Sequence, residues 1–315
     1  MKSILLSALF IMMSLSTFAQ NENDKKILLD SLYQPTDSDY LYYRIIKDYN
    51  LEKESYDIEE YYKSGQIMMR GKSLKRDNIV RNGEFTYYFE NATKKCVQHF
   101  LNGKPSGNYS SWYENGNRKE ESEYVTLVEI FGPELKVNQF WNSSYIQTVK
   151  DGNGFYEDLD QGQLQFFKGN LVNGLKEGEW TGSDKKGKYT FKETYNAGKL
   201  ISGESTTTEN KKFSYTKRNE LPFPKNGMTA FRNDLAQNYK MPNTAINVDG
   251  TIYLSFIVEQ NGTLSNIKVT KGLGEQFDQE AVRAVKKLAK GWTPGKYRGM
   301  NIRVAYNCPI KIKSI

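Results

Sequence analysis

The sequence has few of the residue types that build metal sites and redox centres. Its 315 residues include only two cysteines, Cys96 and Cys308, and one histidine, His99. Because a zinc site takes three or four Cys, His or acidic ligands, this supply leaves little for a metal centre. The cysteines could be oxidised in an exported protein, but their separation favours two unpaired, buried thiols. We therefore expect neither a metal nor a cofactor.

Residues for a catalytic site are also scarce. An active site brings acids, bases and nucleophiles together, whereas His99 stands alone in KCVQHF, where an ordinary strand histidine is the simpler interpretation. The segment EDLDQG at 157–162 has the Asp-x-Asp-x-Gly spacing that begins a calcium loop. Lys168 and Gly169 stand where the distal Glu ligand belongs, which favours a plain acidic turn. We expect a protein without enzymatic activity.

Long hydrophobic runs are almost absent. The run at 4–15 is shorter than the roughly 20 apolar residues that a membrane-spanning helix needs. Thr17 and Ala19 place small side chains where a signal peptidase reads them, so the pattern predicts a signal peptide at 1–19, cut between Ala19 and Gln20. An uncleaved anchor is the alternative. No cysteine follows the run, so a lipoprotein anchor is not indicated, and we expect a protein of the periplasm or cell envelope.

Tyrosine and glycine are abundant, with 22 and 25 copies, and they recur in a pattern. GEFTYYFENA at 83–92 matches GNYSSWYENG at 107–116, an offset of 24 residues (107 − 83). LNGKPSGNY at 101–109 returns as VNGLKEGEW at 172–180. Asn-Gly pairs favour tight hairpin turns, and the flanking aromatic residues favour short strands. Because a single hairpin is marginally stable, the repeats predict a stacked array of β-hairpins at 58–215.

These repeats resemble the MORN repeat family over about 58–204, with a less regular part at 122–148. The resemblance implies a binding or spacer surface that has no chemistry of its own. The preceding segment, 20–57, differs, because DKKILLDSLYQPT and DYLYYRIIKDYN mix acids with apolar residues. We expect one or two short helices or irregular elements there, capping the first repeat.

The composition changes near Leu221. ELPFPKNG places two of the eight prolines close together, which indicates a linker at 216–222 and a second domain at 223–315. Apolar spacing in this domain predicts the order helix, strand, strand, helix, strand, at 228–239, 251–259, 263–270, 278–290 and 301–312.

Several motifs in the second domain have a joint spacing that is hard to obtain by chance. Their main residues are Gly250, Gly262, Ala281, Trp292, Pro294 and Pro309. The domain resembles the C-terminal domain of TonB energy transducers, which implies a small antiparallel sheet packed on one long helix. The expected fold class is therefore α+β and β: MORN-like β-hairpin repeats, then a TonB C-terminal-like sheet and helix. The family often has Tyr-Pro before the first strand, where this chain has Met241-Pro242.

The resemblance implies that the domain binds a protein partner by strand addition, in which an extended segment of an outer-membrane receptor pairs with an exposed sheet edge. It assigns that edge to the last strand, 301–310. The candidate partner-binding residues on it are Asn301, Arg303, Tyr306 and Asn307. Ordinary solvated strand positions are the alternative interpretation.

Positive charge is concentrated in this domain. Residues 221–315 contain 14 Lys and Arg against 6 Asp and Glu, a net charge of +8, whereas the whole chain has +7. This favours an acidic partner segment or an anionic envelope surface, with a solvated helix face as the alternative. Nucleic acid is not an expected partner of an exported protein.

Two hypotheses of function remain, because TonB transducers have a membrane anchor and a proline-rich spacer, and this chain has no proline run. If the signal is retained, the protein is attached to the membrane, the array replaces the spacer, and inner-membrane motor proteins are partners in energy transduction and transmembrane transport. If the signal is cut, the chain is a free periplasmic binding or scaffold protein, not coupled to the proton-driven motor.

Overall fold

The computed structural model describes residues 22–126, 134–160, 165–184, 186–242 and 248–313. The chain divides into two compact units, one built from the chain up to residue 136 with 143–146, the other from 137–142 and the chain from 147 onward. The expected signal peptide, with Ala19 and Gln20, lies outside the described residues. Among the residues that are described, no helix is long and apolar enough to cross a membrane.

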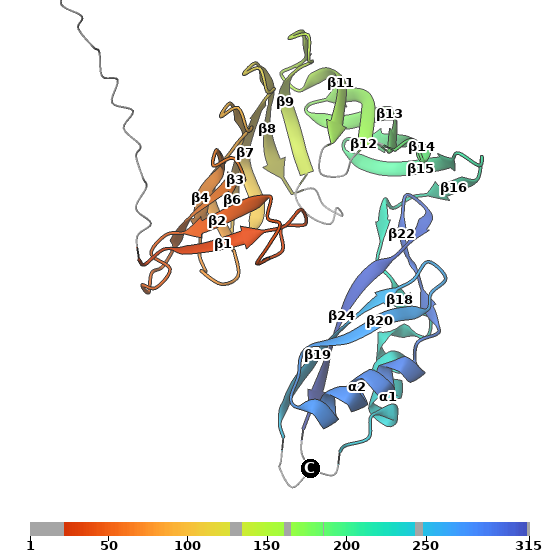
Figure 1. Cartoon of the computed structure of the whole chain (residues 1–315). Coiled ribbons are helices and arrows are strands. Elements are labelled where there is room, and N and C mark those ends of the chain that lie inside the picture. Colours follow the sequence, from red (N-terminus) through yellow and green to blue (C-terminus); the bar gives the residue numbers. More distant parts are fainter. Residues whose placement is uncertain (1–21, 127–133, 161–164, 185, 243–247, 314–315) are drawn as a thin grey trace, which may run out of the picture. The chain divides into compact units, whose positions relative to one another are not determined.

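A 16-stranded antiparallel sheet forms the array, and its strands follow one another in chain order (Figure 1). Its strands are β1 (Lys25–Leu29), β2 (Tyr42–Ile46), β3 (Tyr56–Tyr62), β4 (Ile67–Ser73), β5 (Arg81–Tyr88), β6 (Lys94–Leu101), β7 (Lys104–Trp112), β8 (Arg118–Val125), β9 (Glu134–Trp141), β10 (Gln147–Lys150), β11 (Asn153–Asp160), β12 (Gln165–Val172), β13 (Leu175–Asp184), β14 (Tyr189–Asn196), β15 (Lys199–Thr207) and β16 (Lys212–Tyr215). This run of hairpins confirms the predicted repeated β-hairpin array.

Two of the Asn-Gly pairs form two-residue hairpin turns, as predicted. Asn102 and Gly103 join β6 to β7 with φ of 50° and 83°, and Asn173 and Gly174 join β12 to β13 with φ of 53° and 80°. Both residues of each pair have positive φ, which is the backbone of a two-residue hairpin turn and suits Asn and Gly best.

Other glycines lie inside strands, beneath aromatic rings. A Cβ added at any of them would overlap the ring of a buried aromatic residue on the next strand. The pairs are Gly71 with Phe85, Gly169 with Trp180, Gly182 with Phe191, and Gly203 with Tyr215. The ring covers the backbone where a side chain would stand, so the glycine and the ring together form the packing unit.

Two alternatives were expected at 20–57, short helices or irregular elements, and the helices are wrong. The segment forms β1 and β2, which pair with each other and with β3. Tyrosines of β2 and β3 pair across the two strands: the ring centroids of Tyr43 and Tyr61 are 4.8 Å apart, and those of Tyr42 and Tyr62 are 6.1 Å apart. Such cross-strand aromatic pairs stabilise a sheet more than the local sequence favours a helix.

The C-terminal domain has the element order predicted from the sequence, with short additional strands. Its elements are β17 (Asn219–Glu220), β18 (Phe223–Pro224), α1 (Gly227–Asn238), β19 (Gly250–Val258), β20 (Leu264–Lys271), α2 (Glu275–Lys287), β21 (Trp292–Thr293), β22 (Gly295–Tyr297), β23 (Met300–Ile302) and β24 (Val304–Ile312). Strand β19 directs Leu254 and Phe256 into a core that also holds Phe231 and Leu235 of α1 and Ala281 of α2. Two helices, not one, therefore contribute to this core.

Two boundaries differ from the prediction. The linker expected at 216–222 contains β17, which pairs with β22, so this segment is tied to the domain. The strand expected at 301–312 is divided: β23 pairs with β22, and β24 pairs with β19. The break falls at Arg303, where the chain passes from one small sheet to another.

Candidate partner-binding edge

The main sheet of the C-terminal domain has the strand order β20-β19-β24. In the part of the chain that the structure describes, no strand pairs with the outer side of β20 or of β24. Unpaired N–H and C=O groups along a strand are a template to which an extended peptide can add. The two edges differ in regularity and in the grooves beside them.

Strand β24 is the more regular template. Its nine residues pair with β19 in an antiparallel register that has no shift along the strand. The residues alternate between buried and exposed towards the carboxyl end. An added strand would therefore meet evenly spaced backbone groups, with one face directed to the core and the other to solvent.

Pro309 shows which backbone groups point outward. It lies opposite Tyr253 of β19, and a proline has no N–H, so this is a non-hydrogen-bonded pair whose backbone is directed away from β19. Successive residues of a strand alternate in this direction. Ala305, Asn307 and Lys311 therefore direct both N–H and C=O to the outer side of β24.

Strand β20 is a poorer template. Its register with β19 shifts at two places, and Asn266 has a φ of 49°. Lys268 and Lys271 place positive charges along the strand. Bulges and lysines are the features by which natural sheet edges avoid pairing with other chains.

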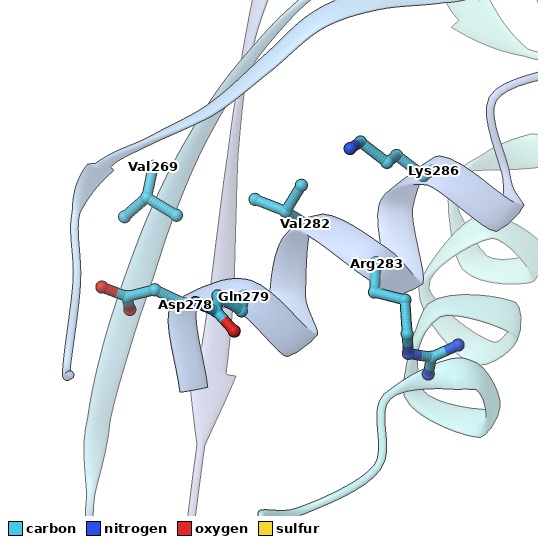
Figure 2. Close-up of a pocket in the computed structure, with 6 residues that line it drawn as sticks. All are labelled: Val269, Asp278, Gln279, Val282, Arg283 and Lys286. Atoms are coloured by element: carbon cyan, nitrogen blue, oxygen red, sulfur yellow. The ribbon is translucent and has the colours of Figure 1, made fainter. Parts of the chain in front are cut away.

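The groove beside β20 is lined by groups that already have partners inside the domain. Figure 2 shows this cavity of about 420 Å³, with Val269 of β20 and Val282 of α2 among its lining residues. The Asp278 carboxylate accepts a hydrogen bond from the N–H of Leu273 at 3.0 Å. Arg283 pairs with its own helix and with a carbonyl of α1. Little in this groove is free to select a ligand.

The groove beside β24 is larger and has a single sign of charge. Its volume is about 650 Å³, and it lies between α1 and the carboxyl end of β24. Leu235 of α1, Tyr239 just after it, and Ile310 and Ile312 of β24 are among its apolar lining, and Arg232, Lys311 and Lys313 supply its charged groups. An extended segment with apolar and acidic residues would match both the apolar lining and the basic groups.

Helix α1 is fixed in place by α2. The N–H of Lys240 donates to Oε1 of Glu280 at 2.6 Å, and Arg283 lies 2.5 Å from the same oxygen. Hydrogen bonds from Arg283 are the main cause that lowers the pKa of Glu280, to about 2. Burial raises the pKa of Tyr239, whose hydroxyl lies 3.5 Å from the carbonyl of Phe277, to about 12. The groove wall is thus pinned by polar contacts at its end.

The four candidate partner-binding residues lie in different settings. Asn301 is on β23 and donates its side-chain N–H to the carbonyl of Gln260 at 2.9 Å. Arg303 precedes β24 and makes two bonds to Glu259, of 2.7 and 2.9 Å. Only Tyr306 and Asn307 lie on β24, and of these Asn307 is exposed.

Tyr306 points into the core of the domain. Its ring stacks on Phe256 at 5.4 Å and meets Trp292 edge-on at 5.1 Å. Burial raises the pKa of its hydroxyl. The even-numbered residues of β24 face the helices, which is why an aromatic residue at this position packs inside. Cys308 shares this face, and burial raises the pKa of its thiol to about 11, so the thiol is protonated at neutral pH.

The motif residues have structural roles. A Cβ at Gly250 would overlap the side chain of Leu273, and one at Gly262, whose φ is 79°, would overlap the carbonyl oxygen of Trp292. Ala281 is fully buried under the sheet, and Trp292 is 1% exposed. These residues hold β19, the β19–β20 turn and α2 together behind the candidate edge.

We expect Gly262→Ala to destabilise the C-terminal domain by about 3 kcal/mol, because it combines positive φ with a backbone overlap. Gly291→Ala is the matched control: its φ is 95° and no atom lies within 4 Å of the added Cβ. The control should lower the free energy of unfolding by about 1 kcal/mol. Urea unfolding of both variants measures the difference, and equal losses would contradict the close contact at Gly262.

The remaining chemically active residues are dispersed. Both cysteines are free thiols, Cys308 buried and Cys96 half-buried. His99 lies on β6, with Nδ1 3.2 Å from the carbonyl of Asn108. Asp158 and Asp160 end β11, and the residues that follow lie outside the described residues. Among the described residues, no group of three or more Cys, His, Asp or Glu is placed to hold a metal ion.

Reasoning from the sequence missed the outward-facing backbone of Ala305 and Lys311 and the groove formed with α1. One signal was available, because a proline within a strand marks a sheet edge and fixes the direction of its neighbours. Pro309 was a known motif residue, but its position in the register with β19 came only from the structure.

Comparison with protein families gives one match. Residues 238–313 match the family described as Gram-negative bacterial TonB protein C-terminal. The match covers the last residue of α1 and every element from β19 to β24, and so includes the three-stranded sheet with both of its edges. No curated protein matches the chain.

Proposed function

We propose that the TonB C-terminal-type domain binds an extended segment of an outer-membrane receptor on the outer side of β24, in support of TonB-type energy transduction. One observation carries this proposal. β24 is a regular edge strand whose backbone at Ala305, Asn307 and Lys311 is directed outward, beside a groove that is apolar and basic. Strand addition needs no catalytic group, and the proposed role is therefore a binding role.

Affinity and selectivity would come from different parts of this edge. The backbone of β24 supplies hydrogen bonds that depend little on the partner's sequence. The groove supplies selection: Leu235 and Ile310 favour apolar side chains, and Arg232 and Lys313 favour acidic ones. Because Pro309 offers a C=O and no N–H, the partner pairs best on either side of this residue.

A titration tests this proposal directly. Synthetic peptides copying the N-terminal segments of outer-membrane receptors from the same genome are titrated calorimetrically into the chain that begins at Gln20. We expect at least one peptide to bind with a Kd in the micromolar range, about −8 kcal/mol. The proposal fails if no peptide binds at concentrations of about 1 mM.

The second candidate is a free periplasmic binding or scaffold protein, and the small residues Thr17 and Ala19 after a short apolar run favour it. Amino-terminal sequencing and fractionation of the native protein separate the two. A mature chain that begins at Gln20 in the soluble periplasmic fraction excludes coupling to inner-membrane motor proteins through this segment. An intact Met1 in the inner-membrane fraction supports the transducer, with the array in place of the spacer.

A further inference from the structure

The turn between β22 and β23 inserts an arginine side chain into the end of the array. Arg298 and Gly299 form this turn, with φ of 49° and 79°. The side chain of Arg298 is only 3% exposed. The backbone N–H of Arg298 donates to the backbone carbonyl of Arg218 at 2.7 Å. The array strands that it meets, β12 and β14, belong to the same compact unit as the C-terminal domain.

The guanidinium of Arg298 is held on three sides. Its Nε lies 2.7 Å from Oε1 of Glu193, and its Nη2 lies 3.3 Å from Oε2. Its Nη1 donates to Oε1 of Gln165 at 2.5 Å. The ring of Phe191 lies beneath it, with 3.3 Å between the guanidinium carbon and the ring centroid. This two-point contact with a carboxylate uses the planar donor geometry that distinguishes Arg from Lys.

The carboxylate of Glu193 is also fully coordinated, although it is 1% exposed. The hydroxyls of Tyr195 and Tyr215 donate to its oxygens at 2.7 and 2.8 Å. Burial by itself raises the pKa of Glu193, but the hydrogen bonds and charge of Arg298, with help from Arg218 and Tyr195, outweigh it and lower the pKa to about 2. Glu193 is therefore ionised at neutral pH and matched by a buried cation.

The same glutamate position occurs near the start of the array. FKETYNAG, which contains Glu193, aligns with IEEYYKSG, which contains Glu60. Glu60 is buried and receives Arg44 from the neighbouring strand β2, at 2.5 Å. The residues opposite Glu193 on its two neighbouring strands are instead Trp180 of β13 and Gly203 of β15, and neither carries a positive charge. In the last repeat, the arginine comes from the C-terminal domain rather than from the array itself.

We propose that the last repeat of the array carries a docking surface, made by Gln165, Phe191, Glu193 and Tyr215, for the β22–β23 hairpin of the same chain. Arg298 is the side chain that this surface receives. The contacts join residues that are 105 and 133 positions apart in the sequence. They make the last repeats and the C-terminal domain one body, in which these repeats are a fixed support and not a flexible spacer.

The docked hairpin leads directly into the candidate binding strand, because β23 ends at Ile302 and β24 begins at Val304. A pull on a partner bound to β24 would therefore reach the array through Arg298. This mechanical consequence rests on the proposed function, whereas the docking itself does not.

Hydrogen exchange of the full chain, without any peptide, tests the docking. Arg298→Met removes the charge and the guanidinium group and keeps an unbranched apolar stem. We expect exchange to become at least tenfold faster at backbone amides of β14 and β16 as well as in the β22–β23 hairpin, because the buried carboxylate of Glu193 loses its main cationic partner and keeps only Arg218, 3.9 Å away. Arg303→Met is the matched control, since Arg303 is 59% exposed and pairs only with Glu259 in its own domain. The control should change the exchange rates of these amides less than twofold.

A double variant and a milder one complete the test. Adding Glu193→Met to Arg298→Met should change exchange by no more than a further twofold, because the two side chains act as a pair. Arg298→Lys keeps the charge without the planar guanidinium, and its exchange rates should lie between those of the parent and of Arg298→Met. This variant replaces Arg298→Met in the test if the Met variant does not fold. Exchange in β14 and β16 that matches the Arg303→Met control, in both Arg298 variants, would overturn the proposal.

The docking and the proposed function are tested by different measurements, so either can be contradicted without the other. Peptide affinity of the Arg298→Met chain should stay within twofold of the parent, because Arg298 does not line the β24 groove. Failure of every peptide to bind the parent chain would remove the proposed function and leave the exchange result unaffected.

Discussion

Asn307→Pro should weaken peptide binding to the domain at least tenfold and leave the fold intact. Asn307 lies in the middle of β24, exposed, with its N–H directed away from β19. Proline removes this donor and places its ring where the added strand would pair. The lost hydrogen bond is worth about 1 kcal/mol, and the steric conflict adds to it. The pairing with β19 does not use this N–H, so stability should fall by no more than about 1 kcal/mol.

Asn307→Ala is the control for the side chain. It keeps the backbone N–H, and binding should stay within about twofold of the parent. Calorimetric titration with the same peptide measures both variants. Parent-like binding by the proline variant would mean that the partner does not pair with β24, whereas equal losses in both variants would assign the effect to the Asn307 side chain.

Gly169→Ala should lower the free energy of unfolding of the array by about 3 kcal/mol. A Cβ at this position would overlap the ring of Trp180, which is 1% exposed and packs beside Tyr156 and Tyr195. The ring also donates its Nε1–H to the carbonyl of Asn170 at 3.0 Å. It cannot move aside without losing that bond and its neighbours, and overpacked cores of this kind are strongly destabilised.

Two comparisons isolate this close contact. Gly178→Ala, on the next strand, has a φ of 66° and open space around the added Cβ, so it should cost about 1 kcal/mol. In a Trp180→Ala background, Gly169→Ala should cost less than about 1 kcal/mol, because the ring is gone. Urea unfolding followed by circular dichroism gives these values. If Gly169→Ala still lowers the free energy of unfolding by about 3 kcal/mol in the Trp180→Ala background, the backbone conformation, and not Trp180, requires the glycine.

The repeated hairpins and the C-terminal sheet were accessible from the sequence because their signals are local. Asn-Gly turns such as Asn102-Gly103 and apolar alternation in β19 each fall within a few residues. The glycines beneath aromatic rings were harder to interpret. Gly169 and Trp180 meet across two strands, and this pairing depends on a register shift between β12 and β13.

The errors have a common physical cause, which is pairing between distant segments. The segment at 20–57 has acids and apolar residues in a helix-like mixture, but its tyrosines pair between β2 and β3. The sequence also did not show which face of β24 carries Tyr306, because this depends on the register with β19. Arg298 gave no local signal at all, since its partner Glu193 is 105 residues away.

The most direct test of the central claim is amide hydrogen exchange of the chain with and without a bound receptor peptide. Pairing on β24 predicts slower exchange at Ala305, Asn307 and Lys311, whose N–H groups point outward, with little change at the residues between them. Slower exchange confined to β20, or no change along β24 when the peptide is bound, would contradict strand addition at this edge.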